Sequence, residues 1–502
     1  MAPTSAPEGK DRCRSALSHP WPGISLVLLS LILFWMCRVE YRIDDAYITY
    51  RYSYNLAHGL GARYYEGENS CGYSTPGFFL LLAAGEFLGI ASHWTGWILG
   101  GIGQAAVAFF LFRIHSGKSA WVPSALAALL VATNVSLLWA GQIGMETAVF
   151  VALVFATIVR ASSESKKGVG PLLAFSILLR LDGLVLAPVL LLFRFKLRPL
   201  LREALTATVI VGAWFAFARL YYGSFLPNSI HAKVIYHEAG FLACFGPFAQ
   251  GIAYFPRTQI PLFALSLLGA GVGIARRESL VVALLVFLTL YVAGFCSSGI
   301  MPFTWYLVPS NIVAIAIAGR GLTFLWEKLA PNRSRRLLAL LVVLFSSLQT
   351  LLALDHLGKH DAANRFKNEP YEKVSDWIRA NLKTGSTVLV GETGYMGYLL
   401  PEYRIIDSSG INCIAVLDIR KRHLSNVTRP SRAELDHLEG MVLRDIIEEF
   451  NPDCFTALIR MPGISVMRRE KSLRDRYEVV HGSWDDASLG RGTLLAVRRD
   501  HK

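Results

Sequence analysis

The sequence predicts a polytopic α-helical membrane protein of about 11 spans, followed by a C-terminal extracytoplasmic α/β domain. The 502 residues are 53% hydrophobic and only 17% charged, with a mean hydropathy of +0.40, whereas soluble domains average about a quarter charged residues. Apolar stretches of spanning length fill the chain up to about residue 354, and residues 355–502 have the mixed composition of a soluble domain. Basic residues cluster beside the apolar stretches, as they do in cytoplasmic loops.

The basic clusters set the expected orientation. They are Lys10–Arg14, Arg113–Lys118, Lys166–Lys167, Arg194–Arg202, Arg276–Arg277 and Arg333–Arg336. If each faces the cytoplasm, residues 1–22 form a cytoplasmic tail, residues 23–354 form the transmembrane domain, and an odd number of spans places residues 355–502 outside. We therefore expect a multi-pass protein of the cell's inner (cytoplasmic) membrane. The net charge of +13 is explained by these loops, so we expect the bilayer and not nucleic acid as a partner.

The spans are predicted from the apolar stretches in chain order. They are 23–39, 96–112, 120–139, 146–160, 203–219, 258–275, 279–295, 305–319 and 337–354, with a short pair at 171–180 and 184–194. The stretch Gly77–Ala91 is about 15 residues long, and a span needs roughly 20. We therefore expect it to be an interfacial or re-entrant helix within the first outer loop, residues 38–95.

The C-terminal segment has the pattern of a small α/β sheet. A helix is expected at 371–382 and strands at 387–390, 403–407, 455–460 and 492–497. Its glycines do not form the G-x-G-x-x-G pattern that binds dinucleotides, so we expect no nucleotide site.

The polar motifs of the membrane domain all fall at the outer face in this topology. They are "DDAYITYRY", "GMET", "RLDG", "PNSIHAK" and "MPFTWY". The adjacent carboxylates Asp44 and Asp45 directly follow a span, where unused charge is costly. They are either functional or the cap of the next helix, since Asp is favoured at helix N-termini. The tyrosines and Arg51 that follow fit a helix in the membrane interface.

The series "DDAYITYRY", "NLAHGLG" and "GYSTP" resembles the first outer loop of the GT-C superfamily of polyprenyl-phosphate-sugar glycosyltransferases. Within it, the chain is most similar to mycobacterial-type terminal arabinofuranosyltransferases and their uncharacterised bacterial relatives. The likeness continues in "GMETAVF", "LLRLDG", "YYGSFLPNSIHAK" and "GETGYMGYLLPEYRIIDSSG" and so covers most of the chain at these landmarks. Relatives often carry Pro where this chain has Leu181, which weakens the match of "RLDG".

The resemblance implies a membrane enzyme that transfers a hexosyl or pentosyl unit, with arabinofuranose as one candidate, from a polyprenyl-phosphate donor to an extracytoplasmic glycan, lipid or protein acceptor. It implies a catalytic Asp that matches Asp44, with Asp45 beside it. A carboxylate takes the proton of the acceptor hydroxyl, and a second one stabilises the cation-like sugar. The alternative is a transporter or flippase of lipid-linked sugars, which predicts broken helices in matching halves; the sequence shows no such repeat.

Further site residues are expected around the Asp pair. The leaving phosphate needs donors, for which His231, Lys233 and Arg180 are the candidates; Lys233 alternatively snorkels to the interface. Substrate contacts are expected from Tyr47, Arg51, Glu146, Asp182, Trp305 and Tyr306. The structural alternatives are a helix-terminal role for Glu146, neutralisation of Arg180 by Asp182, and belt positions for the two aromatic residues. A site without metal and one that holds Mg²⁺ or Mn²⁺ on Asp44, Asp45 or Glu146 both fit.

Overall fold

The computed structural model describes residues 21–116, 121–236, 241–251, 256–425, 427, 431–458, 464, 470–481 and 493–501. The expected cytoplasmic tail lies outside these residues except for its last two positions. The chain forms two compact units. The helical unit comprises Met1–Val39, Gly96–Val211 and Ala239–Gly358, and the loop–sheet unit comprises Glu40–Thr95, Gly212–Glu238 and Lys359–Lys502. The expected first outer loop therefore folds together with the C-terminal segment.

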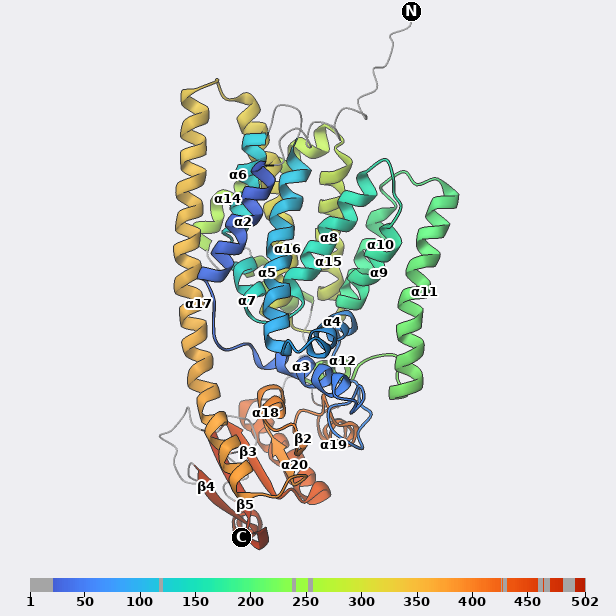
Figure 1. The fold of residues 1–502 in the computed structure, drawn as a ribbon, viewed down its shortest axis with the longest axis vertical. Helices are drawn as coiled ribbons and strands as arrows, with labels where there is room; N and C mark the ends of the chain where they lie inside the picture. Colours follow the sequence, from blue (N-terminus) through green and yellow to red (C-terminus); the bar gives the residue numbers. More distant parts are fainter. Residues whose placement is uncertain are drawn as a thin grey trace, which may run out of the picture. The chain divides into compact units, whose positions relative to one another are not determined.

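Apolar helices make up the helical unit (Figure 1). They are α2 (Trp21–Met36), α5 (Ser92–His115), α6 (Trp121–Ala132), α7 (Val135–Gln142), α8 (Thr147–Ser162), α9 (Val169–Leu179), η1 (Leu181–Val185), α10 (Leu186–Leu190), α11 (Leu197–Tyr222), α13 (Phe241–Gly251), α14 (Pro256–Ala275), α15 (Ser279–Ser298), α16 (Thr304–Lys328) and α17 (Arg333–Asn381). Helices α5, α11 and α17 continue into the loop–sheet unit.

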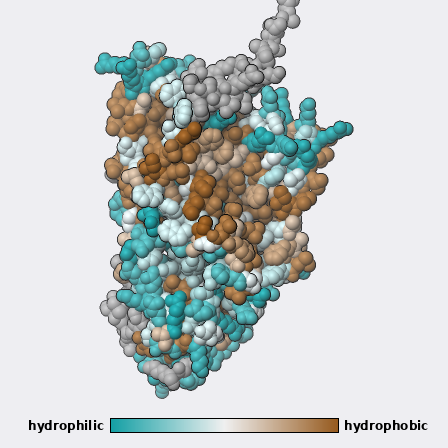
Figure 2. All heavy atoms as spheres, in the orientation of Figure 1, coloured by the Kyte–Doolittle hydropathy of each residue, from teal (hydrophilic) through white to brown (hydrophobic). Residues whose placement is uncertain are grey.

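Length and composition identify the helices that are able to cross a membrane. Among the described residues, α5, α11, α15, α16 and α17 qualify, and α6 with α7, bent by 52°, form a sixth candidate. Six shorter apolar segments of 10–17 residues accompany them, so the number of about 11 spans stays a prediction. On the visible face, hydrophobic side chains dominate the helical unit (Figure 2). The polytopic helical fold with a C-terminal α/β domain is confirmed.

Small residues allow two helices of this unit to pack with their backbones in contact. A Cβ atom at Gly269 of α14 would lie 2.0 Å from the Ile317 carbonyl oxygen, and one at Gly321 of α16 would lie 2.2 Å from the Leu265 carbonyl oxygen. Apolar side chains gain little by leaving lipid for another helix, so close packing through small residues is a main source of helix association in membranes. Helix α16 is accordingly buried along most of its length.

The loop–sheet unit begins with the first outer loop. It holds α3 (Asp44–Ala57) and α4 (Pro76–Phe87), and later segments add α12 (Asn228–Tyr236), α18 (Thr393–Leu399), α19 (Ile414–Leu424), α20 (Arg432–Phe450) and α22 (Lys471–Arg476). Helix α4 has 12 residues, fewer than the roughly 20 of a span. The capping box of Ser431 and Glu434 starts α20, where the serine hydroxyl accepts the Glu434 N–H at 3.2 Å.

A five-stranded sheet forms the core of the C-terminal segment. Its strands are β1 (Thr387–Val390), β2 (Arg404–Asp407), β3 (Cys454–Leu458), β4 (Tyr477–His481) and β5 (Thr493–Arg498), in the order β2-β1-β3-β5-β4. Strand β1 is parallel to β2 and β3, whereas β5 is antiparallel to β3 and β4. Four strands match the expected ones within the described residues, and β4 is additional. The carboxyl end of β1 leads through Gly391 to Glu392 and α18.

Helix α17 joins two segments that the sequence predicts separately. The expected span 337–354 and the expected helix 371–382 belong to one helix of 49 residues, with Pro370 inside it. At 1.5 Å per residue its length is about 74 Å. Its polar second half lies in the loop–sheet unit and places Lys367, Tyr371 and Glu372 there.

Candidate functional site

The Asp pair lies in the first turn of α3 within the loop–sheet unit. The Asp44 carboxylate accepts the backbone N–H groups of Gly394 at 3.1 Å and Tyr395 at 2.8 Å. A Cβ atom at position 394 would lie 1.9 Å from the Asp44 carbonyl oxygen, so only glycine allows α18 to approach this closely. Asp44 thus joins the first outer loop to the C-terminal segment, in addition to any chemical role.

Asp45 faces a different direction because adjacent helix residues point about 100° apart. Its carboxylate is half-buried, and within the described part of the chain it makes no hydrogen bond. Burial raises the pKa of Asp45, the neighbouring Asp44 raises it further, and Lys233 of α12 and Lys367 of α17 oppose the shift. A desolvated carboxylate without donors is a stronger base than an ordinary aspartate.

An ion pair completes this charged group, which we call the Asp45 cluster: Asp44, Asp45, Lys233, Lys367 and Glu392. The Lys367 ammonium lies 2.9 Å from a Glu392 carboxylate oxygen. Burial, and then the negative charge of Asp44, raise the pKa of Glu392 to about 7, although Lys367 opposes the shift. A carboxyl group that titrates near neutral pH is a common feature of sites that move protons.

The two phosphate-binding candidates of α12 are placed differently. Lys233 interacts electrostatically with Asp45, whereas His231 is exposed. Residues two apart on a helix point about 200° apart, so one helix face does not present both side chains to one phosphate. The structure brings Lys233, and not His231, to the Asp pair.

Tyr47 and Arg51 connect α3 to the segment around α18. The Tyr47 ring packs against Tyr395 and Tyr398, with centroids 4.7 Å and 5.4 Å away. The buried Arg51 guanidinium donates to the carbonyl oxygens of Tyr64 at 3.0 Å and Pro401 at 2.6 Å. These contacts hold the loop in place, and direct substrate contacts of Tyr47 and Arg51 stay predictions.

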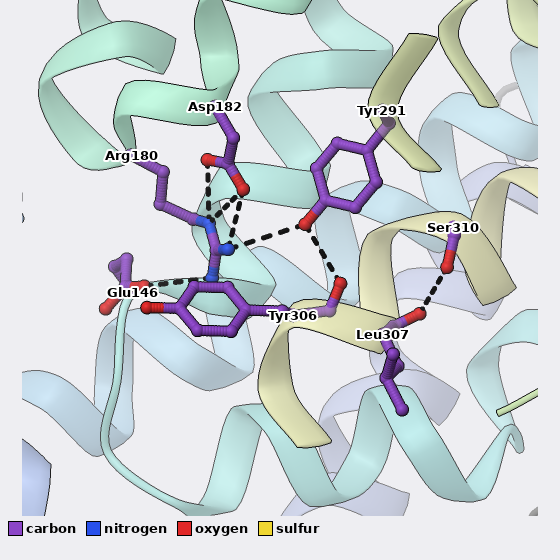
Figure 3. Close-up of polar contacts among 7 residues, drawn as sticks. All are labelled: Glu146, Arg180, Asp182, Tyr291, Tyr306, Leu307 and Ser310. Carbon is purple, nitrogen blue, oxygen red and sulfur yellow. Dashed lines mark hydrogen bonds and ion pairs between the residues drawn. The ribbon is translucent and has the colours of Figure 1, made fainter. Parts of the chain in front are cut away.

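Four further expected site residues meet inside the helical unit, together with Tyr291, which the sequence did not single out (Figure 3). We call this group the Arg180 cluster: Glu146, Arg180, Asp182, Tyr291 and Tyr306. The Arg180 guanidinium donates to Asp182 at 2.7 Å and 3.1 Å, lies 3.3 Å from a Glu146 oxygen, and is centred 4.6 Å from the Tyr306 ring centroid. It also donates to the Tyr291 hydroxyl at 3.4 Å, which in turn donates to the Tyr306 carbonyl at 2.9 Å.

The Arg180 cluster combines residues from "GMET", "RLDG" and "MPFTWY" with Tyr291 of α15. Arg180 and Glu146 are almost fully buried, and Asp182 is 15% exposed. The neutralisation of Arg180 by Asp182 is observed. Because two carboxylates already contact the guanidinium, the expected role of Arg180 as a phosphate ligand stays a prediction. Trp305 is buried and stacks on Phe303 with ring centroids 4.8 Å apart. Its expected contact with a sugar therefore stays a prediction too.

The metal-binding expectation concerned Asp44, Asp45 and Glu146. Asp44 and Asp45 belong to the loop–sheet unit and Glu146 to the helical unit. Among the described residues, no three or more His, Cys, Asp or Glu side chains gather as a metal site requires. The choice between a metal-dependent and a metal-free site stays open.

Sequence reasoning missed Lys367 and Glu392. Glu392 belongs to the motif "GETGYM", on which the family resemblance partly rests. The resemblance assigns no role to this glutamate. Lys367 lies in a polar stretch that was not expected to be helical. The available signal was an acidic residue just beyond the strand expected at 387–390, because ligands commonly bind at the carboxyl ends of strands in α/β sheets.

Comparisons with known proteins show the fold. ArnT from Cupriavidus metallidurans, in the crystal structure bound to undecaprenyl phosphate, is 12% identical and aligns over 94% of this chain and 97% of its own, with a TM-score of 0.65. The apo state of the same protein gives a TM-score of 0.61 with the same identity and coverage. The archaeal oligosaccharyltransferase AglB from Archaeoglobus fulgidus, in complex with an inhibitory peptide and a dolichol-phosphate, is 11% identical over 91% of this chain and 72% of its own, with a TM-score of 0.51.

Comparison by sequence is less informative. A family model described as "Domain of unknown function (DUF8728)" matches residues 360–498, which include the sheet, Lys367 and Glu392. No curated protein matches the chain by sequence. The chain therefore shares its fold with ArnT and AglB.

Proposed function

We propose that the chain is a membrane glycosyltransferase that moves one sugar from a polyprenyl-phosphate donor to an acceptor hydroxyl on the outer side of the cytoplasmic membrane. The observation that carries the proposal is Asp45, a half-buried carboxylate without a hydrogen bond in the described residues, beside Lys233. The fold supports the same proposal, because the chain shares it with ArnT, whose crystal structure holds undecaprenyl phosphate.

In the proposed reaction, the Asp45 carboxylate accepts the proton of the acceptor hydroxyl. The acceptor oxygen then bonds to the anomeric carbon of the sugar, the bond between that carbon and the phosphate oxygen breaks, and the polyprenyl phosphate leaves with the electron pair. Proton removal by a placed base contributes typically about 10²–10⁴-fold to the rate. The Lys233 ammonium stabilises the negative charge that develops on the leaving phosphate.

Asp44 has a different part in this proposal. Two backbone N–H groups already stabilise its anion, and such hydrogen bonds make a carboxylate a weaker base. We assign Asp44 to holding α18 against α3 and to stabilising the positive charge of the sugar in the transition state. The sequence-based expectation gave Asp44 the role of base, and separate variants of the two residues decide between the assignments.

The sugar and the acceptor follow from the family resemblance alone. We propose arabinofuranose, carried on polyprenyl phosphate, as the first donor to test, with a hexose donor as the comparison. The acceptor is a glycan, lipid or protein exposed outside the cytoplasmic membrane, where the Asp45 cluster lies in the topology expected from the basic loops.

The experiment measures transfer from radiolabelled polyprenyl-phosphate arabinofuranose to envelope acceptors in membranes that contain the full chain. Asp45→Asn is expected to lower the rate by at least about 100-fold. Asp418→Asn is the control, since it removes a carboxylate that is 63% exposed and contacts Lys421. Full activity of the Asp45 variant would sink the assignment of the base. Movement of the intact lipid-linked sugar across the membrane without transfer would instead support a flippase.

A further inference from the structure

Tyr64 joins α3 to α18 independently of the contact that Asp44 makes. Its backbone is fixed to α3, because the Tyr64 carbonyl oxygen accepts hydrogen bonds from the Arg51 guanidinium and from the Asn55 side-chain amide, each at 3.0 Å. Its side chain is fixed to α18, where the hydroxyl donates to the Thr393 carbonyl at 2.5 Å and accepts from the Thr393 hydroxyl at 2.9 Å. The Tyr64 side chain is fully buried, so it offers no surface to a substrate.

Two glycines give α18 the smooth face that these contacts need. A Cβ atom at Gly397 would lie 1.7 Å from the Tyr64 hydroxyl oxygen, and one at Gly394 would lie 1.9 Å from the Asp44 carbonyl oxygen. Residues three apart lie on the same face of a helix. The two glycines of the motif "GETGYMG" therefore let one face of α18 pack directly on the first outer loop.

A chain of hydrogen bonds fixes Thr393 from the side of the sheet as well. The Asn412 side-chain amide donates to the Thr393 hydroxyl at 3.3 Å and to the Asp407 carboxylate at 3.1 Å. Asp407 is the last residue of β2, is fully buried and also accepts the backbone N–H of Asn412 at 2.9 Å. Buried polar networks of this kind make the groups that they join rigid. Thr393, the first residue of α18, is thus held by both the sheet and the loop.

The peptide group between Thr393 and Gly394 carries the consequence for Asp44. The carbonyl oxygen of this group accepts the Tyr64 hydroxyl, and its N–H donates to the Asp44 carboxylate at 3.1 Å. A peptide group is planar, so its C=O and N–H directions are fixed relative to each other. The bond from Tyr64 therefore also sets the direction in which the Gly394 N–H points.

We propose that Tyr64 is a positioning residue of the transfer reaction, which holds the start of α18 so that the Gly394 and Tyr395 N–H groups stay on the Asp44 carboxylate. The proposal rests on the glycosyltransferase function above and deepens it, because it names a residue that acts on Asp44 without contact with the substrate.

Tyr64→Phe removes the hydroxyl and keeps the ring, whose centroid lies 5.6 Å from that of Tyr52. The peptide group is then free to tilt, and the Asp44 carboxylate loses its fixed orientation. The proposed function gives Asp44 a role in the transition state, and loss of such a contact lowers kcat without changing KM. We expect kcat to fall about 10-fold, the usual size of one lost hydrogen bond, with the KM of donor and acceptor unchanged.

The experiment measures kcat and KM for transfer from radiolabelled polyprenyl-phosphate arabinofuranose in membranes that contain the full chain. It also measures hydrogen exchange at the Gly394 and Tyr395 amides by mass spectrometry of the purified protein in detergent. Tyr64→Phe is expected to speed this exchange. Thr393→Val, which removes the second bond to Tyr64, is expected to act in the same direction with a smaller effect and tests the contact even if Tyr64→Phe does not fold. Thr393→Ser keeps the hydroxyl and is expected to behave as the wild type.

Tyr477→Phe is the matched control. Tyr477 is equally buried, and its hydroxyl donates to the Pro452 carbonyl at 2.8 Å within the C-terminal segment. This variant is expected to lose thermal stability as Tyr64→Phe does, but to keep the kcat and the amide exchange of the wild type.

Two results would overturn the proposal: an equal loss of kcat in Tyr477→Phe, or unchanged exchange at Gly394 and Tyr395 in both Tyr64→Phe and Thr393→Val. A wild type without transfer would contradict the glycosyltransferase function, and the exchange measurement would still decide whether Tyr64 holds these amides on Asp44.

Discussion

The helical unit and the loop–sheet unit each bring carboxylates and cations together, but they satisfy these charges differently. In the Arg180 cluster, both carboxylates contact one guanidinium, and the guanidinium also meets a tyrosine hydroxyl and an aromatic ring. In the Asp45 cluster, Asp44 is held by two N–H groups while its neighbour Asp45 accepts no hydrogen bond within the described residues. The same residue types are therefore fully engaged with a cation in the Arg180 cluster, whereas in the Asp45 cluster one of the two adjacent carboxylates has no hydrogen-bond donor among the described residues.

This difference matters because a carboxylate surrounded by donors is a weak base, and one that lacks them is a strong base. The Arg180 cluster has the features of a structural junction, since it ties the end of α9 to the start of α8 and to α15 and α16. The Asp45 cluster instead brings two helix starts and two ammonium groups together with Asp45, a half-buried carboxylate to which the described residues donate no hydrogen bond. Sequence alone does not separate the two, because both contain adjacent or nearly adjacent charges at the ends of apolar stretches.

The largest expected effect comes from breaking the Arg180 cluster. Arg180→Met leaves Glu146 and Asp182 buried without their shared cation, and removal of one partner from a buried pair typically costs about 3–5 kcal/mol. We expect a clear loss of thermal stability of the purified protein in detergent. The control Arg276→Met breaks the exposed pair with Glu327, whose side chains are 45% and 44% exposed, and such pairs contribute about 0–1 kcal/mol. Equal stability of the two variants would contradict the structural role of Arg180.

A smaller and more local effect is expected from Gly394→Ala. The added methyl group meets the Asp44 carbonyl oxygen at 1.9 Å, so α18 has to move away and the two N–H bonds to Asp44 break. We expect faster hydrogen exchange at the Tyr395 amide and slower transfer, with the helical unit unchanged. Gly358→Ala is the matched control, since nothing lies within 4 Å of its added methyl group. Unchanged exchange at Tyr395 would mean that Asp44 does not hold α18.

Much of the fold could be predicted from the sequence, because the length of an apolar stretch and the basic residues beside it are local properties of the chain. The helix expected at 279–295 is α15, Ser279–Ser298, and the strand expected at 387–390 is β1 with the same bounds. The continuity of α17 was missed because its composition changes from apolar to polar midway, although a helix forms on both sides of that change.

For the candidate site, the sequence points only to residues that belong to a recognisable motif. Asp44 and Asp45 stand out as adjacent carboxylates, whereas the partners of Asp44 lie 350 and 351 residues further along the chain. Lys367 and Glu392 join the cluster through the packing of α17, β1 and α3, which no local pattern reports. The same limit applies to Glu146 and Arg180, whose contact depends on tertiary packing across 34 residues.

Chemical rescue of Asp45→Ala tests the central claim most directly. The small side chain leaves space beside Lys233, and added formate supplies a carboxylate that is able to take the proton of the acceptor hydroxyl. We predict that Asp45→Ala transfers no measurable sugar, that formate restores transfer in proportion to its concentration, and that Asp44→Ala is not restored. Undiminished transfer by Asp45→Ala, or rescue of Asp44→Ala alone, would contradict the claim that Asp45 is the carboxylate that performs the chemistry.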